Sequence, residues 1–166
     1  MIEIEVPVSR IAWNELPAPV RGEIENRLGA GVRSGSPQLG GFSCGMASRL
    51  ALADGSTVFA TAIPTGDSFA DRYRIEGDTT SQLPAGIPTP AVWFTLAVDG
   101  WRVLVFDDLT DRHPRFEQPA ELAAVLAVVE DLSRILIPSP LPQVPTLAVE
   151  VTVARSAMAG GYDHGA

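Results

Sequence analysis

The sequence of 166 residues contains no lysine, and all twelve of its basic residues are arginine. It has one cysteine, Cys44, and two histidines, His113 and His164. One cysteine excludes an internal disulfide and a thiolate metal cluster, and two distant histidines do not suggest a zinc site. No apolar run approaches the roughly 20 residues of a membrane helix, and the first ten residues do not resemble a signal peptide. We therefore expect a cytoplasmic protein that does not enter a membrane.

The net charge is −8, and apolar residues make up 46% of the chain. A nucleic-acid backbone or an anionic membrane surface requires clustered basic residues, which this chain lacks, so we expect neither partner. The Ala-, Gly-, Arg- and Pro-rich usage is typical of GC-rich bacterial coding. That bias explains why lysine is scarce, but it does not supply another cation where chemistry needs one.

The spacing of apolar residues predicts helices over residues 17–28, 68–83 and 119–137. Strands are expected over residues 32–38, 47–53, 56–63, 92–98 and 101–106. Asp54-Gly55 predicts a hairpin with a type I′ turn, and Asp99-Gly100 joins a second hairpin. The fold class is therefore α+β, a small antiparallel sheet of about five strands with packed helices.

The two ends of the chain differ from this central part. Residues 1–12 form an N-terminal extension, in which residues 2–8 alternate like an edge strand or belong to a disordered leader. Residues 13–137 form the domain itself. Residues 138–166 begin with a proline-rich segment, continue with a candidate strand over 146–154, and end in a tail that we expect to be disordered.

A glycine-rich segment, GGFSCG, occupies residues 40–45 between the first two expected strands. Glycines in such a turn let backbone N–H groups approach phosphate oxygens without a Cβ in the way. The same composition also suits an ordinary turn. The segment is not a Walker loop, because no Gly-Lys-Ser/Thr follows it.

Strand, glycine loop, strand, turn, strand, helix, hairpin and acidic connector follow one another in an order that resembles a known family. The matching segments are GGFSCG, LALADGSTVFATA, YRIEG, LPAGIPTP and WRVLVFDDLTDRHP. From residue 13 to about residue 140 the chain resembles the small N-terminal lobe of the aminoglycoside phosphotransferase-like, or protein-kinase-like, family. The resemblance implies a kinase-like fold and, as a cofactor, ATP or GTP with Mg²⁺.

The resemblance also implies roles for individual residues in binding the nucleotide. They are Gly40, Gly41, Ser43, Gly45, Thr61, Glu76, Phe106, Asp107 and Leu109. Thr61 stands where the family has a lysine against the phosphates, and its uncharged hydroxyl cannot replace that ammonium. Glu76 resembles the glutamate that holds the lysine, although it also suits a solvated helix surface. Residues 106–109 resemble the hinge, whose backbone would meet an adenine edge.

The catalytic part of the family is not matched. A large helical lobe would carry an H-x-D loop, a downstream Asn and a metal-binding Asp. Asp163-His164-Gly165 has similar residue types in the wrong order, so we assign no catalytic residue and no metal site. We also expect no fixed positive group where the phosphates would lie, and an inward Arg49 or Arg74 would contradict this expectation.

Four interpretations remain open. In the first, the chain is a truncated lobe that is catalytically incompetent alone and binds a nucleotide or a partner. In the second, it is a phosphotransferase completed by a partner chain. In the third, it is a non-enzymatic interaction module that forms homo-oligomers or binds a partner lobe, and in the fourth, it is a compact α+β domain of unrelated function.

Overall fold

The computed structural model describes residues 10–38, 43–109, 113–142 and 144. In chain order its elements are a 3-10 helix Trp13–Glu15, α1 (Ala18–Leu28), β1 (Val32–Pro37), β2 (Met46–Leu52), β3 (Thr57–Pro64), α2 (Ala70–Ser81), β4 (Val92–Val98), β5 (Trp101–Asp107) and α3 (Pro119–Leu136). Every one of the expected helices and strands in this range is confirmed, with boundaries that differ by at most two residues. The N-terminal strand, the strand over 146–154 and the terminal tail lie outside the described residues.

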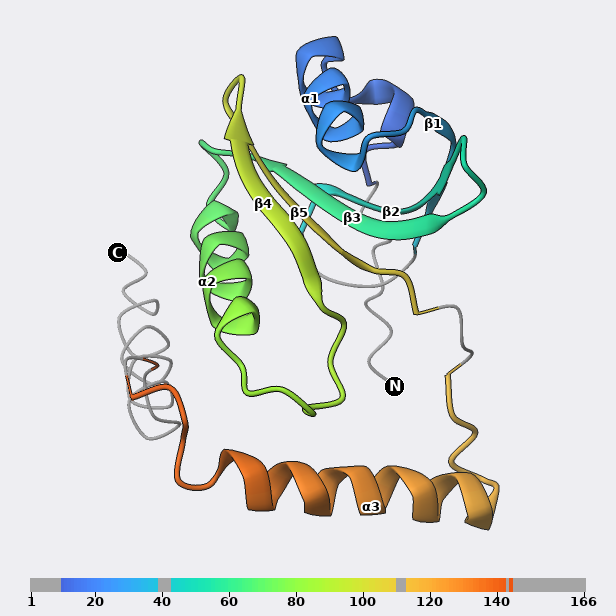
Figure 1. The fold of residues 1–166 in the computed structure, drawn as a ribbon, viewed down its shortest axis with the longest axis vertical. Helices are drawn as coiled ribbons and strands as arrows, with labels where there is room; N and C mark the ends of the chain where they lie inside the picture. Colours follow the sequence, from blue (N-terminus) through green and yellow to red (C-terminus); the bar gives the residue numbers. More distant parts are fainter. Residues whose placement is uncertain (1–9, 39–42, 110–112, 143, 145–166) are drawn as a thin grey trace, which may run out of the picture.

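The five strands form one sheet in the order β1-β2-β3-β5-β4, and all neighbouring pairs are antiparallel. The two hairpins β2–β3 and β4–β5 come from consecutive strands, while α2 connects β3 to the edge strand β4 (Figure 1). This α+β arrangement, a five-stranded antiparallel sheet with helices, is the one that the sequence led us to expect.

Helix α1 covers one face of the sheet (Figure 1). Its residues Val20 and Ile24 are fully buried, because apolar side chains one turn apart fall on the same side of a helix. Gly29 ends the helix in the left-handed conformation, with φ at 70°. The core on this face contains Trp13, Leu16, Val20, Ile24, Met46, Leu50, Leu52, Val58, Ala60, Ala62, Leu96, Val103 and Val105.

Helix α2 covers the opposite face. Ala70 and Tyr73 of α2 pack there against Ile63, Leu104 and Phe106 of the sheet. Successive strand residues point to opposite faces, so alternate positions of β3 and β5 belong to each core. This second face is the one on which the predicted nucleotide residues of β3 lie.

The turn at Asp54 differs from the type I′ geometry that we expected. Type I′ requires a positive φ at both central residues, whereas only Gly55 has one, at 92°. Asp54 Oδ1 accepts hydrogen bonds from Ser56 N at 2.9 Å and Ser56 Oγ at 2.7 Å, which hold it in another local turn. The type I′ pattern occurs instead in the second hairpin, where φ is 50° at Asp99 and 74° at Gly100.

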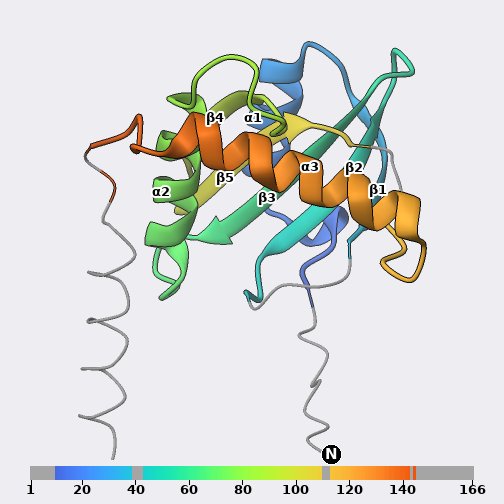
Figure 2. The same ribbon diagram turned by 90° about the horizontal axis from the view of Figure 1, so that it is seen from below.

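Helix α3 lies apart from both packed faces of the sheet (Figures 1 and 2). Arg115 precedes it and binds Glu121 in its first turn, with 2.9 Å between Arg115 Nη2 and Glu121 Oε1. None of its 18 residues is buried, and Leu126 and Val129 are 58% and 55% exposed. Among the described helices, none is both long enough and apolar enough to pass through a bilayer.

Candidate nucleotide-binding site

The glycine-rich segment is described only at its C-terminal end, since Gly40 and Gly41 lie outside the described residues. The Ser43 hydroxyl lies 2.8 Å from the Tyr73 hydroxyl of α2 and forms a hydrogen bond with it. A Cβ at Gly45 would lie 2.4 Å from the carbonyl oxygen of Ala62. Glycine at this position is therefore explained by close backbone packing between β2 and β3.

Thr61 lies on the face of β3 that is covered by α2. Its direct neighbours in the sheet are Ala47 of β2 and Leu104 of β5. Thr61 is 9% exposed, and its Oγ1 has no hydrogen-bond partner in the described chain. The position that the family gives to a phosphate-binding lysine is therefore an apolar, uncharged part of the sheet.

Glu76 lies on an exposed part of α2 and forms no ion pair within the described residues. Glu76 is exposed, but the surrounding protein still displaces part of the water around its carboxyl. This desolvation raises the pKa of the Glu76 carboxyl above its ordinary value. Its position fits a solvated helix residue, which is one of the two readings that the sequence allowed.

Three side chains form a row across the same face of the sheet. Arg49 of β2 pairs in register with Phe59 of β3, and Phe59 pairs with Phe106 of β5. The two rings are 6.5 Å apart between their centroids. Since residues directly opposite one another in an antiparallel sheet share a face, all three side chains lie toward α2. Phe106 is therefore brought close to Phe59, and both belong to the core on this face.

Arg49 reaches across β3 to the connector that follows β5. Its Nε lies 2.7 Å from Asp108 Oδ1, and its Nη2 donates to the backbone oxygen of Leu109 at 3.0 Å. The Asp108 side chain is only 3% exposed. Arg49 therefore binds both Asp108 and the carbonyl of Leu109, and we call the contact with Asp108 the Arg49–Asp108 bridge. Leu109 is one of the hinge residues whose backbone, according to the family resemblance, would meet an adenine edge.

Asp107 binds the edge strand β4. Its carboxylate accepts hydrogen bonds from Trp93 Nε1 at 2.7 Å and from Ala91 N at 3.0 Å. These two donors, with Trp93 the stronger, hold the pKa of the Asp107 carboxyl below its ordinary value. The backbone N–H of Asp107 also donates to Ala91 O at 2.9 Å. Asp107 therefore holds β4 in place with both its side chain and its backbone.

The two arginines that could have replaced the lysine take other positions. In the β3–β5 pairing, Thr61 lies beside Leu104 and Val58 lies beside Asp107. Asp108 follows Asp107, so the Arg49–Asp108 bridge lies at the end of this pairing that leads away from Thr61. Arg74 lies on the surface of α2 and pairs with Asp71 at 3.7 Å and Asp78 at 3.1 Å. Neither guanidinium occupies the position beside Thr61.

The sequence reading did not identify Arg49, Phe59 and Asp108 as neighbours. The signal that could have found them is a single charge, Arg49, inside an otherwise apolar strand. Within the described residues, no three His, Cys, Asp or Glu side chains lie close enough together to hold a metal ion.

Comparison with known proteins finds solved structures that are similar to part of this chain. No family model matches it, and no curated protein matches it. A solved candidate fructosamine-3-kinase from Thermobifida fusca matches 58% of the chain at 24% identity, with a TM-score of 0.40. Another from Haemophilus somnus matches 66% of the chain at 16% identity, with a TM-score of 0.43. The chain spans 33% and 37% of the length of these two proteins.

Proposed function

We propose that this chain is a non-catalytic, kinase-like lobe that assembles with a second copy of itself through α3. The observation that carries this proposal is the apolar face of α3, no residue of which is buried. Contiguous apolar surface of this kind on a folded domain marks an interaction site. The Arg49–Asp108 bridge supports the non-catalytic part of the proposal, because the same arginine occupies the Leu109 carbonyl in the hinge segment.

The apolar residues of α3 repeat at alternating intervals of three and four. They are Leu122, Val125, Val129, Leu132 and Leu136. This spacing is that of the a and d positions of a heptad, which form the seam between two packed helices. The last charged residues of the helix, Glu130, Asp131 and Arg134, fall outside the seam and pair with one another.

The seam is self-complementary when two copies run antiparallel. Leu122 of one copy then lies opposite Leu132 of the other, and Val125 lies opposite Val129. Each pair occurs twice, as a two-fold axis requires, and no charged residue enters the seam. Leu126 and Val128 lie beside the seam and widen the apolar surface, with exposures of 58% and 43%. A second copy of the chain therefore fits this surface chemically.

On the nucleotide side, the chain's own contacts take the place of a ligand. Arg49 and Phe59 are paired on neighbouring strands, on the face of the sheet that is covered by α2. Arg49 also donates a hydrogen bond to the backbone oxygen of Leu109 in the hinge segment. Thr61 provides no charge against a triphosphate, and phosphoryl transfer depends on charge neutralisation. We therefore propose that neither ATP nor GTP with Mg²⁺ binds between β3 and the hinge.

The alternative is a phosphotransferase that a partner chain completes. That function would require the partner to supply the catalytic loop and the metal ligands, and it would require Arg49 to leave Asp108 so that the hinge carbonyl becomes accessible. Mg²⁺-dependent phosphorylation of a hydroxylated acceptor by the purified chain, alone or mixed with a helical lobe that carries an H-x-D loop, would favour this alternative.

Size-exclusion chromatography with light scattering tests the proposed assembly. A single helix pair buries less than a standard interface, so we expect a dimer with a dissociation constant on the order of micromolar. Val129→Glu places a charge in the centre of the seam and should give a monomer. Ala127→Glu is the matched control, because residue 127 lies outside the seam, and it should remain dimeric. A wild-type chain that is monomeric at about 1 mM would contradict the proposal.

A further inference from the structure

A small pocket lies between α2 and the outer strands of the sheet. It is lined by Tyr73, Arg74, Asp78, Thr95, Arg102 and Leu104. Its volume is about 20 Å³, which is room for about one water-sized group, such as a single oxygen atom of a ligand. Arg102 pairs in register with Ile63 and lies at the opposite end of β5 from Asp107. The pocket therefore lies at the end of β5 away from the hinge, and it adjoins two residues of the implied nucleotide-binding set, because Leu104 pairs with Thr61 and Tyr73 binds Ser43.

Arg102 carries a buried donor that faces no acceptor in the described part of the chain. Its Nε is buried and has no hydrogen-bond partner among the described residues. It also forms no ion pair there, although acidic residues outnumber basic ones by 20 to 12 in the sequence. A buried donor without an acceptor costs free energy, so an oxygen ligand that accepts from Arg102 would be stabilised.

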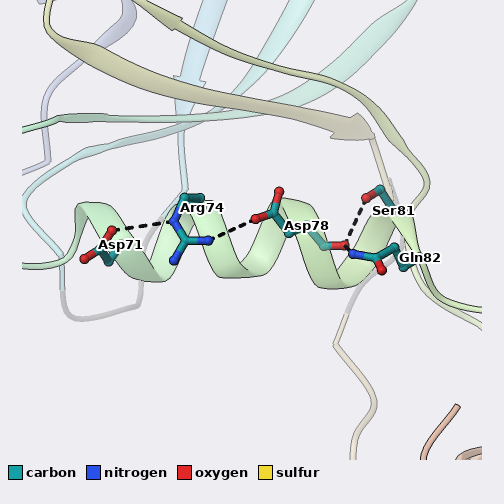
Figure 3. Close-up of polar contacts among 5 residues, drawn as sticks. All are labelled: Asp71, Arg74, Asp78, Ser81 and Gln82. Carbon is teal, nitrogen blue, oxygen red and sulfur yellow. Dashed lines mark hydrogen bonds and ion pairs between the residues drawn. The ribbon is translucent and has the colours of Figure 1, made fainter. Parts of the chain in front are cut away.

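The two arginines that line the pocket differ in their ion pairs. Arg74 Nη1 donates to Asp78 Oδ2 at 3.1 Å, and the pair lies along α2 (Figure 3). The Asp78 backbone oxygen is also occupied, because it accepts from Ser81 Oγ and Gln82 Nε2 (Figure 3). The lining thus contains two guanidinium groups and one carboxylate, and Arg74 is paired both with Asp78 and with Asp71, which lies outside the lining. One negative charge from a ligand would therefore pair with Arg102.

We infer that this pocket binds a single carboxylate group, with Arg102 as its principal donor and Arg74 as its neighbour. A carboxylate matches the planar donor geometry of a guanidinium and carries the one negative charge that Arg102 lacks. A phosphate dianion fits less well, because its second charge would face Asp78 without a partner. The carboxylate is supplied by a free organic acid or by an acidic side chain or C-terminus of a peptide.

Two-dimensional ¹H–¹⁵N NMR titration of the full chain with sodium acetate tests this inference. We expect saturable shifts of the Thr95 and Arg102 amides with a dissociation constant of about 1–10 mM, and no such shifts with sodium chloride at equal ionic strength. Linear shifts without saturation, or the same shifts with chloride, would overturn the inference.

Variants separate the pocket from general surface effects. Arg102→Gln should weaken acetate binding about tenfold, while Arg72→Gln, an arginine of α2 outside the lining, should leave it unchanged. Arg102→Lys keeps the charge without the buried Nε and should bind at an intermediate affinity. Equal binding by the wild type and by a folded Arg102→Gln variant would overturn the inference.

A second titration distinguishes the two sources of the carboxylate. A short peptide that ends in a free carboxylate is compared with the same peptide amidated at its C-terminus. Tighter binding of the free-acid peptide than of acetate supports a peptide ligand, and weaker binding supports a free organic acid. Binding of the amidated peptide as tightly as the free acid would overturn the role of the carboxylate.

Discussion

Arg49 of β2 and Asp108, which follows β5, form an ion pair across the intervening strand β3, with 2.7 Å between Nε and Oδ1. The Asp108 side chain is 3% exposed, and its Oδ2 has no other partner in the described chain. The buried carboxylate therefore depends on Arg49 for its neutralisation. The same contact fixes the connector after β5 against the sheet.

Arg49→Met should lower the free energy of unfolding by about 2–3 kcal/mol, because it leaves the buried Asp108 carboxylate without a donor. Methionine keeps a long unbranched side chain over Phe59, so the loss reports on the charge and the hydrogen bonds. Urea denaturation measures the effect. Arg134→Met is the control: it removes an exposed pair on α3 and should cost less than about 0.5 kcal/mol. Equal effects in the two variants would show that the bridge contributes nothing specific.

Gly45→Ala should destabilise the chain by about 2 kcal/mol or more, because its Cβ would meet the Ala62 carbonyl, a backbone atom that cannot move aside easily. Gly22→Ala is a matched control. Nothing lies within 4 Å of a Cβ at Gly22 in α1, and alanine should stabilise the helix by about 0.5–1 kcal/mol. Thermal unfolding of both variants measures the contrast, and a Gly45→Ala variant as stable as wild type would mean that β2 and β3 lie farther apart.

Much of this fold follows from local patterns. Period-two and period-four spacing of apolar residues predicts the strands and helices, because each pattern depends only on which face is buried. The turn type at Asp54 could not be read in the same way. Asp54-Gly55 and Asp99-Gly100 have the same letters, but Ser56 donates to the Asp54 carboxylate and changes the loop geometry.

The site was less predictable than the fold. The sequence indicates that Thr61 cannot act as the lysine does, since this depends on one side chain. It does not indicate that Arg49 binds Asp108, because the two residues are 59 positions apart and meet only through the strand order. Nor does it separate the two readings of Glu76, whose exposure depends on how α2 is rotated over the sheet.

Asp107→Asn should reduce the loss of stability in acid. Its pKa is lowered by hydrogen bonds from Trp93 and Ala91. Its contribution is therefore present above the unfolded pKa of about 3.9 and lost as the pH falls through the folded pKa. Denaturant midpoints between pH 6 and the most acidic pH that allows refolding measure this. The difference between wild type and variant should shrink as the pH falls, and a constant difference would contradict the assignment.

Glu76→Gln should have the opposite pH dependence. Desolvation raises the pKa of Glu76 in the folded chain, so its favourable contribution is present below the unfolded pKa of about 4.3 and is lost as the pH rises through the folded pKa. The variant should match wild type in acid and exceed it at neutral pH. Because Glu76 is exposed, the gain should be at most about 0.5 kcal/mol. A variant that is less stable than wild type at pH 7 would show that Glu76 has a favourable partner.

Calorimetric titration of ATP into the full chain, with and without Mg²⁺, is the most direct test of the claim that the nucleotide site is closed by the chain's own side chains. We expect no saturable heat up to about 1 mM nucleotide in either condition. Saturable, Mg²⁺-dependent binding with a dissociation constant below about 100 μM would contradict the claim.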